Sequence, residues 1–343
     1  MTTTTDFAKY TTKFFSVYLV HDRHASLNTI ESYKTSFIHF IDFMKVKHGI
    51  SVESITLNEL TRENVLAFLR WLVEEKGNAL STRNQRLSAF RSFALFLQYY
   101  VVEKMEQWQN ILSIKDITTD SKPLNYLTTE GVKLLLDQPD ASCPHGLRHL
   151  AILSLLFDSG ARVQEIADLM VSSIRIDCAP QTLKLFGKGR KSRIVPLSES
   201  QVKILYQYMK VFHLLDPVKS QYPLFFSSRG EKLTRSGITY ILQKYAVMAR
   251  RLSSNLIPQR LTCHSLRHSK AMAMVDAGVN IVYIRDFLGH ASLQSTDVYA
   301  RASGKAKKEA FEKASSKFSP DPLTEAKWED NDDLKAWLKR HKK

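Results

Sequence analysis

Residues 261–301 constrain the fold most, because they set four reactive side chains within a run of helix-forming apolar residues. The stretch reads LTCHSLRHSKAMAMVDAGVNIVYIRDFLGHASLQSTDVYAR. Its reactive members are His264, Arg267, His290 and Tyr299. The apolar residues between them predict helices built around a polar site.

The spacing of these four residues favours phosphate chemistry. His264 and Arg267 are three residues apart, so on a helix they share one face, where together they could hold two oxygens of one phosphate. Tyr299 follows His290 after ASLQSTDV, and its phenol could be a covalent nucleophile if a cationic site lowered the cost of its phenolate. Taken alone, a core histidine or a surface tyrosine is the rival interpretation. Together the residues predict the C-terminal part of a DNA strand-transfer site.

The length of 343 residues suits two domains, each with a sizeable core. No apolar run approaches the roughly 20 residues needed to cross a bilayer, and the N-terminus lacks a basic region followed by an apolar core. Three scattered cysteines argue against a disulfide framework and fit a reducing compartment. These features predict a cytoplasmic protein without a membrane partner.

The positive charge is concentrated in one segment. The chain has a net charge of +15, and Lys and Arg exceed Asp and Glu by 13 within residues 113–318, against 2 within 1–112 and none within 319–343. The segment with the His, Arg and Tyr cluster therefore carries nearly all of the excess. This distribution favours a nucleic-acid partner over a membrane surface.

Helical periodicity predicts a bundle of four or five helices at the N-terminus. Asn28 with Glu31 resembles a capping pair, and Thr61 can cap a further helix. A polar segment with a proline then predicts an interdomain linker. The predicted boundaries are 1–112 for the helical DNA-binding domain, 113–125 for the linker, 126–318 for the catalytic domain and 319–343 for a C-terminal tail.

The helix expected from about residue 81 carries polar side chains that could meet a phosphate backbone or base edges in the major groove. A solvated polar face is the alternative and the commoner fate of such residues. The candidate DNA-binding residues of this helix are Thr82, Arg83, Asn84 and Arg86.

Residues 183–197, LKLFGKGRKSRIVPL, predict a β-hairpin, because two short apolar runs flank a basic tip. Lys188 lies in the tip, where a lysine can approach the minor groove and donate a proton to a leaving oxygen. Arg190 and Lys191 beside it are further candidate DNA-binding residues.

Arg162 follows a Gly-Ala turn and begins an apolar-faced helix. Its planar guanidinium could grip two phosphate oxygens at once. Glu165, one turn later, either orients a basic side chain of the site or is an exposed helix carboxylate. An isolated Arg or Lys at a turn is usually a solvated charge, so the functional interpretation depends on several such residues occurring together.

Six residues occur in the order and local contexts of one family. The contexts are ARVQEI, GKGRKSR, HSLRHS, LGHAS and STDVYAR, and the residues are Arg162, Lys188, His264, Arg267, His290 and Tyr299. From about residue 5 to 318 the chain resembles the tyrosine recombinases, also called the phage integrase family, including its Xer-like members. The resemblance implies a mainly α fold: a SAM-like helical core-binding bundle followed by a mixed α/β catalytic domain with a small sheet or hairpin.

The resemblance also implies a mechanism. Tyr299 would attack a scissile phosphate and form a 3′-phosphotyrosyl link with release of a 5′-hydroxyl. Arg162 and Arg267 would stabilise the charge of the transition state, and the two histidines would hydrogen-bond the phosphate or assist proton transfer. Lys188 would be the general acid. No cofactor, ATP or metal is implied, because the ester conserves the bond energy and arginines supply the positive charge.

The partners implied are double-stranded DNA recombination sites, a homo-tetramer that exchanges strands through a Holliday junction, and an accessory DNA-bending protein. A C-terminal helix would dock on a neighbouring protomer. Leu334, Trp337 and Leu338 form one face of a short basic helix that could do so, and residues 311–316 are the alternative. Action on DNA would place the protein at the nucleoid.

Several functions compete with the first interpretation. A type IB topoisomerase shares similar chemistry, but the histidine of LGHAS, the small helical N-terminal domain and the tail favour a recombinase. A catalytically silent DNA-binding protein is disfavoured by the complete set of six residues. A mobile-element integrase or transposase is our first expectation for the biological role, and a Xer-like dimer-resolving recombinase is the alternative.

Two other patterns resemble sites. Cys143, His145 and His149 suggest zinc, but a fourth ligand at plausible spacing is missing. Cys263 precedes His264, but neighbours in a helix point apart, which argues against a Cys/His nucleophile. We therefore expect neither pattern to be a site.

Overall fold

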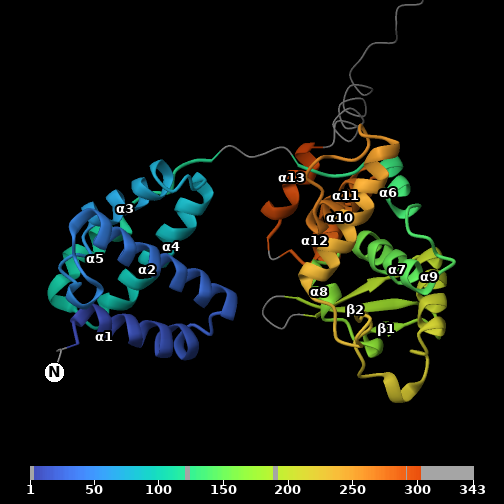
Figure 1. The fold of residues 1–343 in the computed structure, drawn as a ribbon, viewed down its shortest axis with the longest axis horizontal. Helices are drawn as coiled ribbons and strands as arrows, with labels where there is room; N and C mark the ends of the chain where they lie inside the picture. Colours follow the sequence, from blue (N-terminus) through green and yellow to red (C-terminus); the bar gives the residue numbers. More distant parts are fainter. Residues whose placement is uncertain (1–3, 120–123, 188–191, 291, 303–343) are drawn as a thin grey trace, which may run out of the picture. The chain divides into compact units, whose positions relative to one another are not determined.

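The computed structural model describes residues 4–119, 124–187, 192–290 and 292–302. It divides into two compact units, Met1–Lys122 and Pro123–Lys343, each with a hydrophobic core of its own. As Figure 1 shows, the first unit is helical and the second combines helices with a small sheet. The predicted mainly α fold with a mixed α/β second part is confirmed.

The first unit is built from helices throughout the part of residues 4–119 that has regular structure. Thr61 caps α3 as the sequence predicts. The predicted capping pair of Asn28 and Glu31 is wrong, because the helix begins earlier and Ser26 caps it. The elements are α1 (Asp6–Lys13), a π-helical segment (Phe14–Asp22), α2 (Leu27–His48), α3 (Arg62–Glu74), α4 (Leu80–Gln98) and α5 (Met105–Leu112).

Phenylalanine rings fill the core of the first unit. Phe37 of α2 stacks on Phe90 of α4 with ring centroids 5.1 Å apart, and Phe93 meets the edge of Phe37 at the same distance. Buried aromatic rings remove much apolar surface from water, so these contacts fix α2 against α4. Ile114 is also buried in this core, so the start of the polar segment packs with the first unit.

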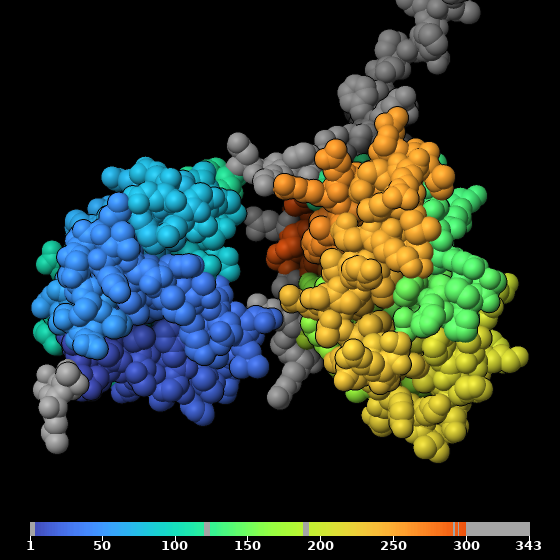
Figure 2. All heavy atoms as spheres, viewed as in Figure 1, coloured from blue at the N-terminus to red at the C-terminus, as the bar shows by residue number. Residues whose placement is uncertain are grey.

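The second unit packs helices around α7, whose apolar residues are almost all buried. The apolar run LAILSLLF, residues 150–157, lies within α7. In Figure 2 the orange segment, around residues 250–290, covers much of the visible face of this unit. The helices are α6 (Thr129–Leu136), α7 (Pro144–Asp158), α8 (Val163–Ala167), α9 (Glu199–Val211), α10 (Arg235–Leu252), α11 (Cys263–Asp276), α12 (Ile281–Leu288) and α13 (Gln294–Ala302).

The sheet of the second unit has three antiparallel strands in the order β1-β2-β3: β1 (Ile174–Arg175), β2 (Thr182–Phe186) and β3 (Ser192–Pro196). The register of β2 and β3 pairs Leu183 with Val195, and both are fully buried. The predicted hairpin is therefore confirmed in its strands. The short β1 was not expected, because two residues are too few to show strand periodicity.

Parts of the expected organisation lie outside the described residues, namely the hairpin tip with Lys188, Arg190 and Lys191, and the tail 319–343 with its Leu334, Trp337 and Leu338 face. The alternative docking segment 311–316 lies outside them as well. Across the described helices, none has both the length and the apolar character needed to span a membrane.

Candidate active site

Arg267 is the buried centre of a cluster of arginines. It lies on α11, which begins at a capping box in which Thr262 and Ser265 each accept a hydrogen bond from the other's backbone amide. Its side chain is fully buried, and its terminal nitrogens donate to the carbonyls of Gly160 and Leu288 at 2.7 Å each. Burial and the neighbouring arginines lower the pKa of Arg267 to about 10, so it stays protonated at neutral pH.

Arg162 lies at the edge of the same cluster. It caps the N-terminal end of α8, two residues after a left-handed turn at Gly160 with φ of 56°. Its Nη1 donates to Glu165 Oε1 at 3.0 Å, and its backbone amide donates to Glu165 Oε2 at 2.8 Å. The side chain of Arg162 is 39% exposed and that of Glu165 only 4%. A buried carboxylate therefore holds a guanidinium that a ligand can reach.

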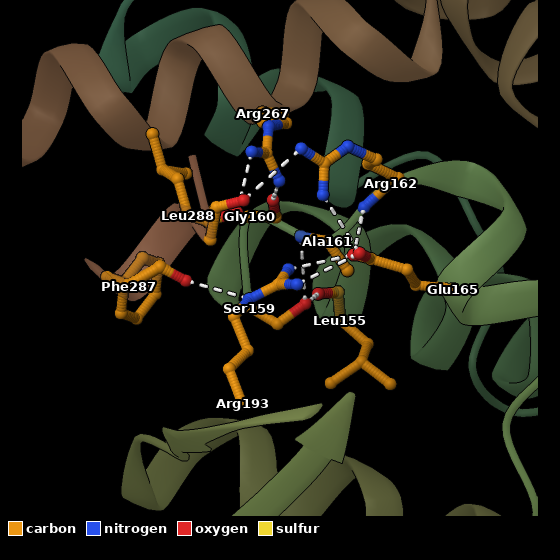
Figure 3. A network of polar contacts seen from close by, with 11 residues as sticks. Leu155, Ser159, Gly160, Ala161, Arg162, Glu165, Arg193, Arg267, Phe287 and Leu288 are labelled. Carbon is orange, nitrogen blue, oxygen red and sulfur yellow. Dashed lines mark hydrogen bonds and ion pairs between the residues drawn. The ribbon is translucent and has the colours of Figure 1, made fainter. Parts of the chain in front are cut away.

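Three successive carbonyls at the end of α12 bind three different arginines. The last carbonyls of a helix have no partner within it, and they form the negative end of the helix dipole. Figure 3 shows the guanidiniums converging on this end from α11, from the start of α8 and from β3. The bonds are Arg193 Nε to Phe287 O at 3.0 Å, Arg267 Nη2 to Leu288 O at 2.7 Å and Arg162 Nη2 to Gly289 O at 3.4 Å.

His264 and His290 lie near these arginines. His264 is exposed on α11, and partial burial together with the charges of Arg267 and Arg162 lowers its pKa. His290 follows the end of α12, and its Nδ1 is 2.9 Å from the hydroxyl of Thr296. Burial and the same two arginines lower the pKa of His290 to about 4. Both rings are therefore neutral at pH 7 and able to donate one hydrogen bond and accept another.

Tyr299 is buried beside the cluster, with 2% of its surface exposed. Its hydroxyl lies 2.9 Å from Nδ1 of His268, and its ring stacks on His290 with centroids 6.3 Å apart. Burial raises the pKa of Tyr299, and the charges of Arg267 and Arg162 act against that rise. The phenol is therefore protonated at neutral pH, and its hydroxyl shares a hydrogen bond with the histidine.

His268 is a residue of this site that the sequence analysis missed. Burial, with His264 and Arg267 nearby, lowers the pKa of His268 to about 4, so the ring that hydrogen-bonds Tyr299 is neutral at pH 7. Its ring packs against that of His264 at 4.4 Å between centroids. The spacing of four residues from His264 to His268 was a visible signal that both lie on one helix face. That Tyr299 would face the pair was not visible.

Arg193 on β3 is the second missed residue. Its two terminal nitrogens bind both oxygens of Glu165, at 2.9 and 2.8 Å, and its side chain is 12% exposed. Burial alone would raise the pKa of the Glu165 carboxyl, but the hydrogen bonds and charge of Arg193, with those of Arg162, lower it below its usual value. Glu165 is thus a buried anion that orients basic residues, which is the first of the two interpretations weighed for it.

Of the four predicted DNA-binding residues of α4, Arg83, Asn84 and Arg86 form hydrogen bonds with other residues of the first unit. Arg83 is 5% exposed and donates to the Lys115 carbonyl, and Asn84 exchanges hydrogen bonds with the backbone of Ile117. Arg86 donates to the carbonyl of Ser32 and to the hydroxyl of Ser36 on α2. Thr82 is half-buried. These contacts tie α4 to α2 and to the following segment, and DNA contact by the four residues stays a prediction.

The Cys143 and histidine pattern makes a structural cluster. Cys143 caps α7, and Nδ1 of His149 lies 2.9 Å from the hydroxyl of Tyr245. Arg148 lies between the two histidines and donates to the carbonyl of Phe226. In the described part of the chain, no three His, Cys, Asp or Glu side chains gather as a metal site would require.

The second unit should lose stability in mild acid, because the pKa values of three of its histidines are lowered by the fold. Burial lowers the pKa values of His149, His268 and His290 to about 4 each. The unfolded chain takes up these protons below pH ~6.5 and the folded chain only near pH 4, so stability present above 6.5 is lost as the pH falls. Each ring contributes at most ~1.4 kcal/mol per pH unit, less because the rings are partly solvated. The thermal midpoint should fall by several degrees from pH 7 to 5.

A matched pair of variants tests this prediction by thermal unfolding followed by circular dichroism. His149→Gln removes one titrating ring while keeping a group that can hydrogen-bond Tyr245, and it should flatten the pH dependence. His213→Gln changes an exposed histidine of the same unit and should leave the dependence unchanged. Equal slopes for wild type and His149→Gln would contradict the assignment.

Two family descriptions match the chain. "Phage integrase family" matches residues 125–305, which contain the arginine cluster and Tyr299. "Phage integrase, N-terminal SAM-like domain" matches residues 13–99, within the helical first unit. The two matches fall on different units, in the order that the resemblance of the sequence implies.

Curated relatives match over most of their length. A protein described as "Putative integrase/recombinase y4rC", from Sinorhizobium fredii, is 32% identical over 315 residues, which cover 90% of this chain and 93% of that protein. The tyrosine recombinase XerC of Herpetosiphon aurantiacus is 33% identical over 291 residues, covering 84% and 89%.

Solved structures share the fold at lower identity. The XerH site-specific recombinase bound to palindromic difH substrate has a TM-score of 0.67 at 21% identity, covering 84% of this chain and 81% of that one. The Tn1549 transposon integrase in complex with a circular intermediate DNA has a TM-score of 0.63 at 16% identity, covering 88% and 98%. With the arginine cluster and the buried tyrosine described above, these matches show that the chain belongs to the phage integrase family, the tyrosine recombinases that cleave DNA and exchange strands.

Proposed function

We propose that Tyr299 is the nucleophile of this recombinase and that Arg162 and Arg267 bind the scissile phosphate. The observation that supports this most is the placement of a buried phenol beside two guanidiniums whose charges act on its pKa. Fixed cations next to a nucleophile stabilise the charge that builds on phosphorus during attack. The exposed edge of Arg162 offers the phosphate its entry to the cluster.

The reaction follows from these positions. The Tyr299 oxygen attacks phosphorus, the bond from phosphorus to the 5′ oxygen breaks, and a 3′-phosphotyrosyl ester forms. Lys188 gives a proton to the departing 5′ oxygen. His264 and His290 hydrogen-bond the phosphate or pass on the tyrosine proton. A 5′-hydroxyl of a second strand then attacks the ester and releases Tyr299. The ester conserves the bond energy, so no ATP is consumed, and the arginines supply the positive charge that a metal would otherwise provide.

The proposed partners are double-stranded recombination sites. Related structures hold such DNA: XerH with difH, and the Tn1549 integrase with a circular intermediate. By the same likeness, this chain would assemble as a tetramer on two sites and pass through a Holliday junction, with an accessory DNA-bending protein as a further partner. The tail 319–343 would dock on a neighbouring protomer. Because its proposed substrate is chromosomal or element DNA, we expect the protein to act in the cytoplasm, at the nucleoid.

DNA contact outside the catalytic cluster is proposed for two places. The hairpin tip with Arg190 and Lys191 would approach the backbone near Lys188, because the basic excess of the chain falls in this segment. In the first unit, Thr82 and the exposed edges of Arg86 and Asn84 are the candidates on α4, whereas Arg83 is occupied inside the unit.

For the biological role we keep mobile-element integration first. The tail beyond Tyr299 and the relative from Sinorhizobium fredii, described as an integrase/recombinase, support it. A Xer-like role in resolving chromosome or plasmid dimers is the second candidate, supported by the XerC of Herpetosiphon aurantiacus. An excision assay separates them: a plasmid carrying the flanks of the gene as direct repeats loses the intervening segment in either case, but only an integrase also inserts a circle into an unrelated target.

The proposed chemistry has a direct test. Duplexes from the sequence flanking the gene are nicked near the candidate cleavage point, so that a short fragment diffuses away and religation is prevented. Incubated in EDTA, the wild-type protein should form a covalent protein–DNA adduct at the 3′ end. An adduct at the 5′ end, or one abolished by EDTA, would overturn the proposed reaction.

A further inference from the structure

Arg193 reaches from the hairpin into the arginine cluster and contacts Glu165, Phe287 and Gly289 there. From β3 it binds both oxygens of Glu165 and the carbonyl of Phe287, all at 2.8–3.0 Å. On the other side it packs on Gly289, where an added Cβ would lie 3.0 Å from its Cδ and 3.1 Å from its Nη1. Figure 3 shows it entering the network from the sheet, opposite Arg267.

Arg193 and Arg162 compete for one carboxylate. Arg193 takes both oxygens of Glu165 in a bidentate pair, whereas the side chain of Arg162 meets only Oε1, with the Arg162 backbone amide on Oε2. A guanidinium has five N–H donors, so the single contact with Glu165 and the long one with Gly289 leave further donors on the exposed Arg162. The competition thus keeps Arg162 available to a phosphate.

The charge of the cluster depends on this competition. Arg162, Arg193 and Glu165 together carry a net charge of +1. If Arg193 lost its charge, Glu165 would be a buried anion with Arg162 as its remaining guanidinium partner among these contacts, and a bidentate pair is the favoured geometry for the two groups. Arg162 would turn inward, and the net charge of the trio would fall to zero.

We propose that Arg193 is a positioning residue for strand cleavage, which occupies Glu165 so that Arg162 faces the phosphate uncompensated. It acts through Glu165 and does not itself touch the DNA. The inference rests on the proposed function of Arg162 and goes beyond it. It predicts the direction of a second effect, which a purely structural salt bridge would not produce. When Arg193 is neutral, neutralising Glu165 as well restores the positive charge beside the phosphate and should raise the cleavage rate again.

The test compares single-turnover adduct formation on the nicked duplex by the full chain. Arg193→Met should slow adduct formation at least ~30-fold while the DNA dissociation constant changes less than ~3-fold. Adding Glu165→Gln should recover at least ~5-fold of that loss, since the trio regains its net charge of +1. Arg193→Lys keeps the charge without the fork and should fall between wild type and Arg193→Met.

Controls separate this outcome from unfolding and from loss of charge on the sheet. Arg175→Met removes an exposed arginine from β1 and should leave the cleavage rate unchanged. Rates are compared at least 15 degrees below each variant's thermal midpoint, so that all proteins are folded. Arg193→Met within ~3-fold of the wild-type rate, or a double variant as slow as the single one, overturns the proposal. Failure of the wild-type protein to form the adduct would instead overturn the proposed function.

Discussion

Replacing Tyr299 with Phe should abolish the covalent adduct while leaving DNA affinity and folding close to wild type. The hydroxyl is the only attacking atom in the proposed reaction, so the rate should fall at least ~10⁴-fold, below detection. The phenylalanine ring keeps the buried position and the stacking on His290. It loses one hydrogen bond to His268, worth about 1 kcal/mol. Gel detection of the adduct and a DNA titration measure the two quantities.

The matched control is Tyr283→Phe, which alters an exposed tyrosine on the neighbouring α12 and should leave the adduct intact. An adduct that survives Tyr299→Phe would mean that another side chain attacks, and the assignment of Tyr299 would be wrong. A parallel loss of DNA binding would mean that the hydroxyl supports folding or docking instead of chemistry.

Arg267→Gln should damage both stability and catalysis. The glutamine leaves the carbonyls of Gly160 and Leu288 without their charged donor in a fully buried place, which costs about 1–3 kcal/mol for each carbonyl left unsatisfied. The cleavage rate of the protein that remains folded should fall about 10²–10³-fold, the usual loss when one fixed donor to a developing charge is removed. Urea unfolding and adduct formation at low temperature measure the two effects separately.

Arg267→Lys refines this prediction, because it keeps the charge but cannot reach two carbonyls with a fork. It should lie between wild type and Arg267→Gln in stability. Arg251→Gln, an exposed arginine at the end of α10, is the control for loss of a positive charge and should change neither quantity. Normal stability of Arg267→Gln would show that the two buried hydrogen bonds are not important for the fold.

Helices with a clear apolar face were predictable from the sequence. The helices of the N-terminal bundle have this character, and Thr61 caps α3 as predicted. Their periodicity reports burial against a core, which is the same cause that forms them. The start of α2 was misplaced, because Ser26 and Asn28 are both good caps and only packing decides between them.

Arg193 could have been recognised from the period of its strand. Alternate residues of a strand face the same side, so Arg193 lies on the face of the buried Val195, and an arginine on a buried face needs a partner. In the motif GKGRKSR, roles were assigned to Lys188, Arg190 and Lys191, and Arg193 at its end was given none. The identity of the partner, Glu165, depends on how β3 packs against α8, which no local pattern contains.

The pairing of His268 with Tyr299 likewise depends on tertiary packing and cannot be seen in a local sequence pattern. The two residues are 31 positions apart and come from helices that pack through the tertiary fold. Sequence order and motif selected the residues that are proposed for the site. They did not predict that the phenol of Tyr299 would be buried and hydrogen-bonded to the neutral ring of His268. Burial of a single hydroxyl is decided by the packing of α11, α12 and α13.

The carbonyls at the end of α12 bind arginines without neutralising them, so they leave the cluster with a net positive charge. They hold Arg162, Arg193 and Arg267 through dipoles, so among the groups that bind these arginines in the described part of the chain, Glu165 carries the one full negative charge. The three guanidiniums and Glu165 therefore carry +2. In the proposed reaction the phosphodiester carries one negative charge, and its pentavalent transition state approaches two. The cluster would then match the transition state better than the bound substrate, which is the condition for raising a rate instead of an affinity.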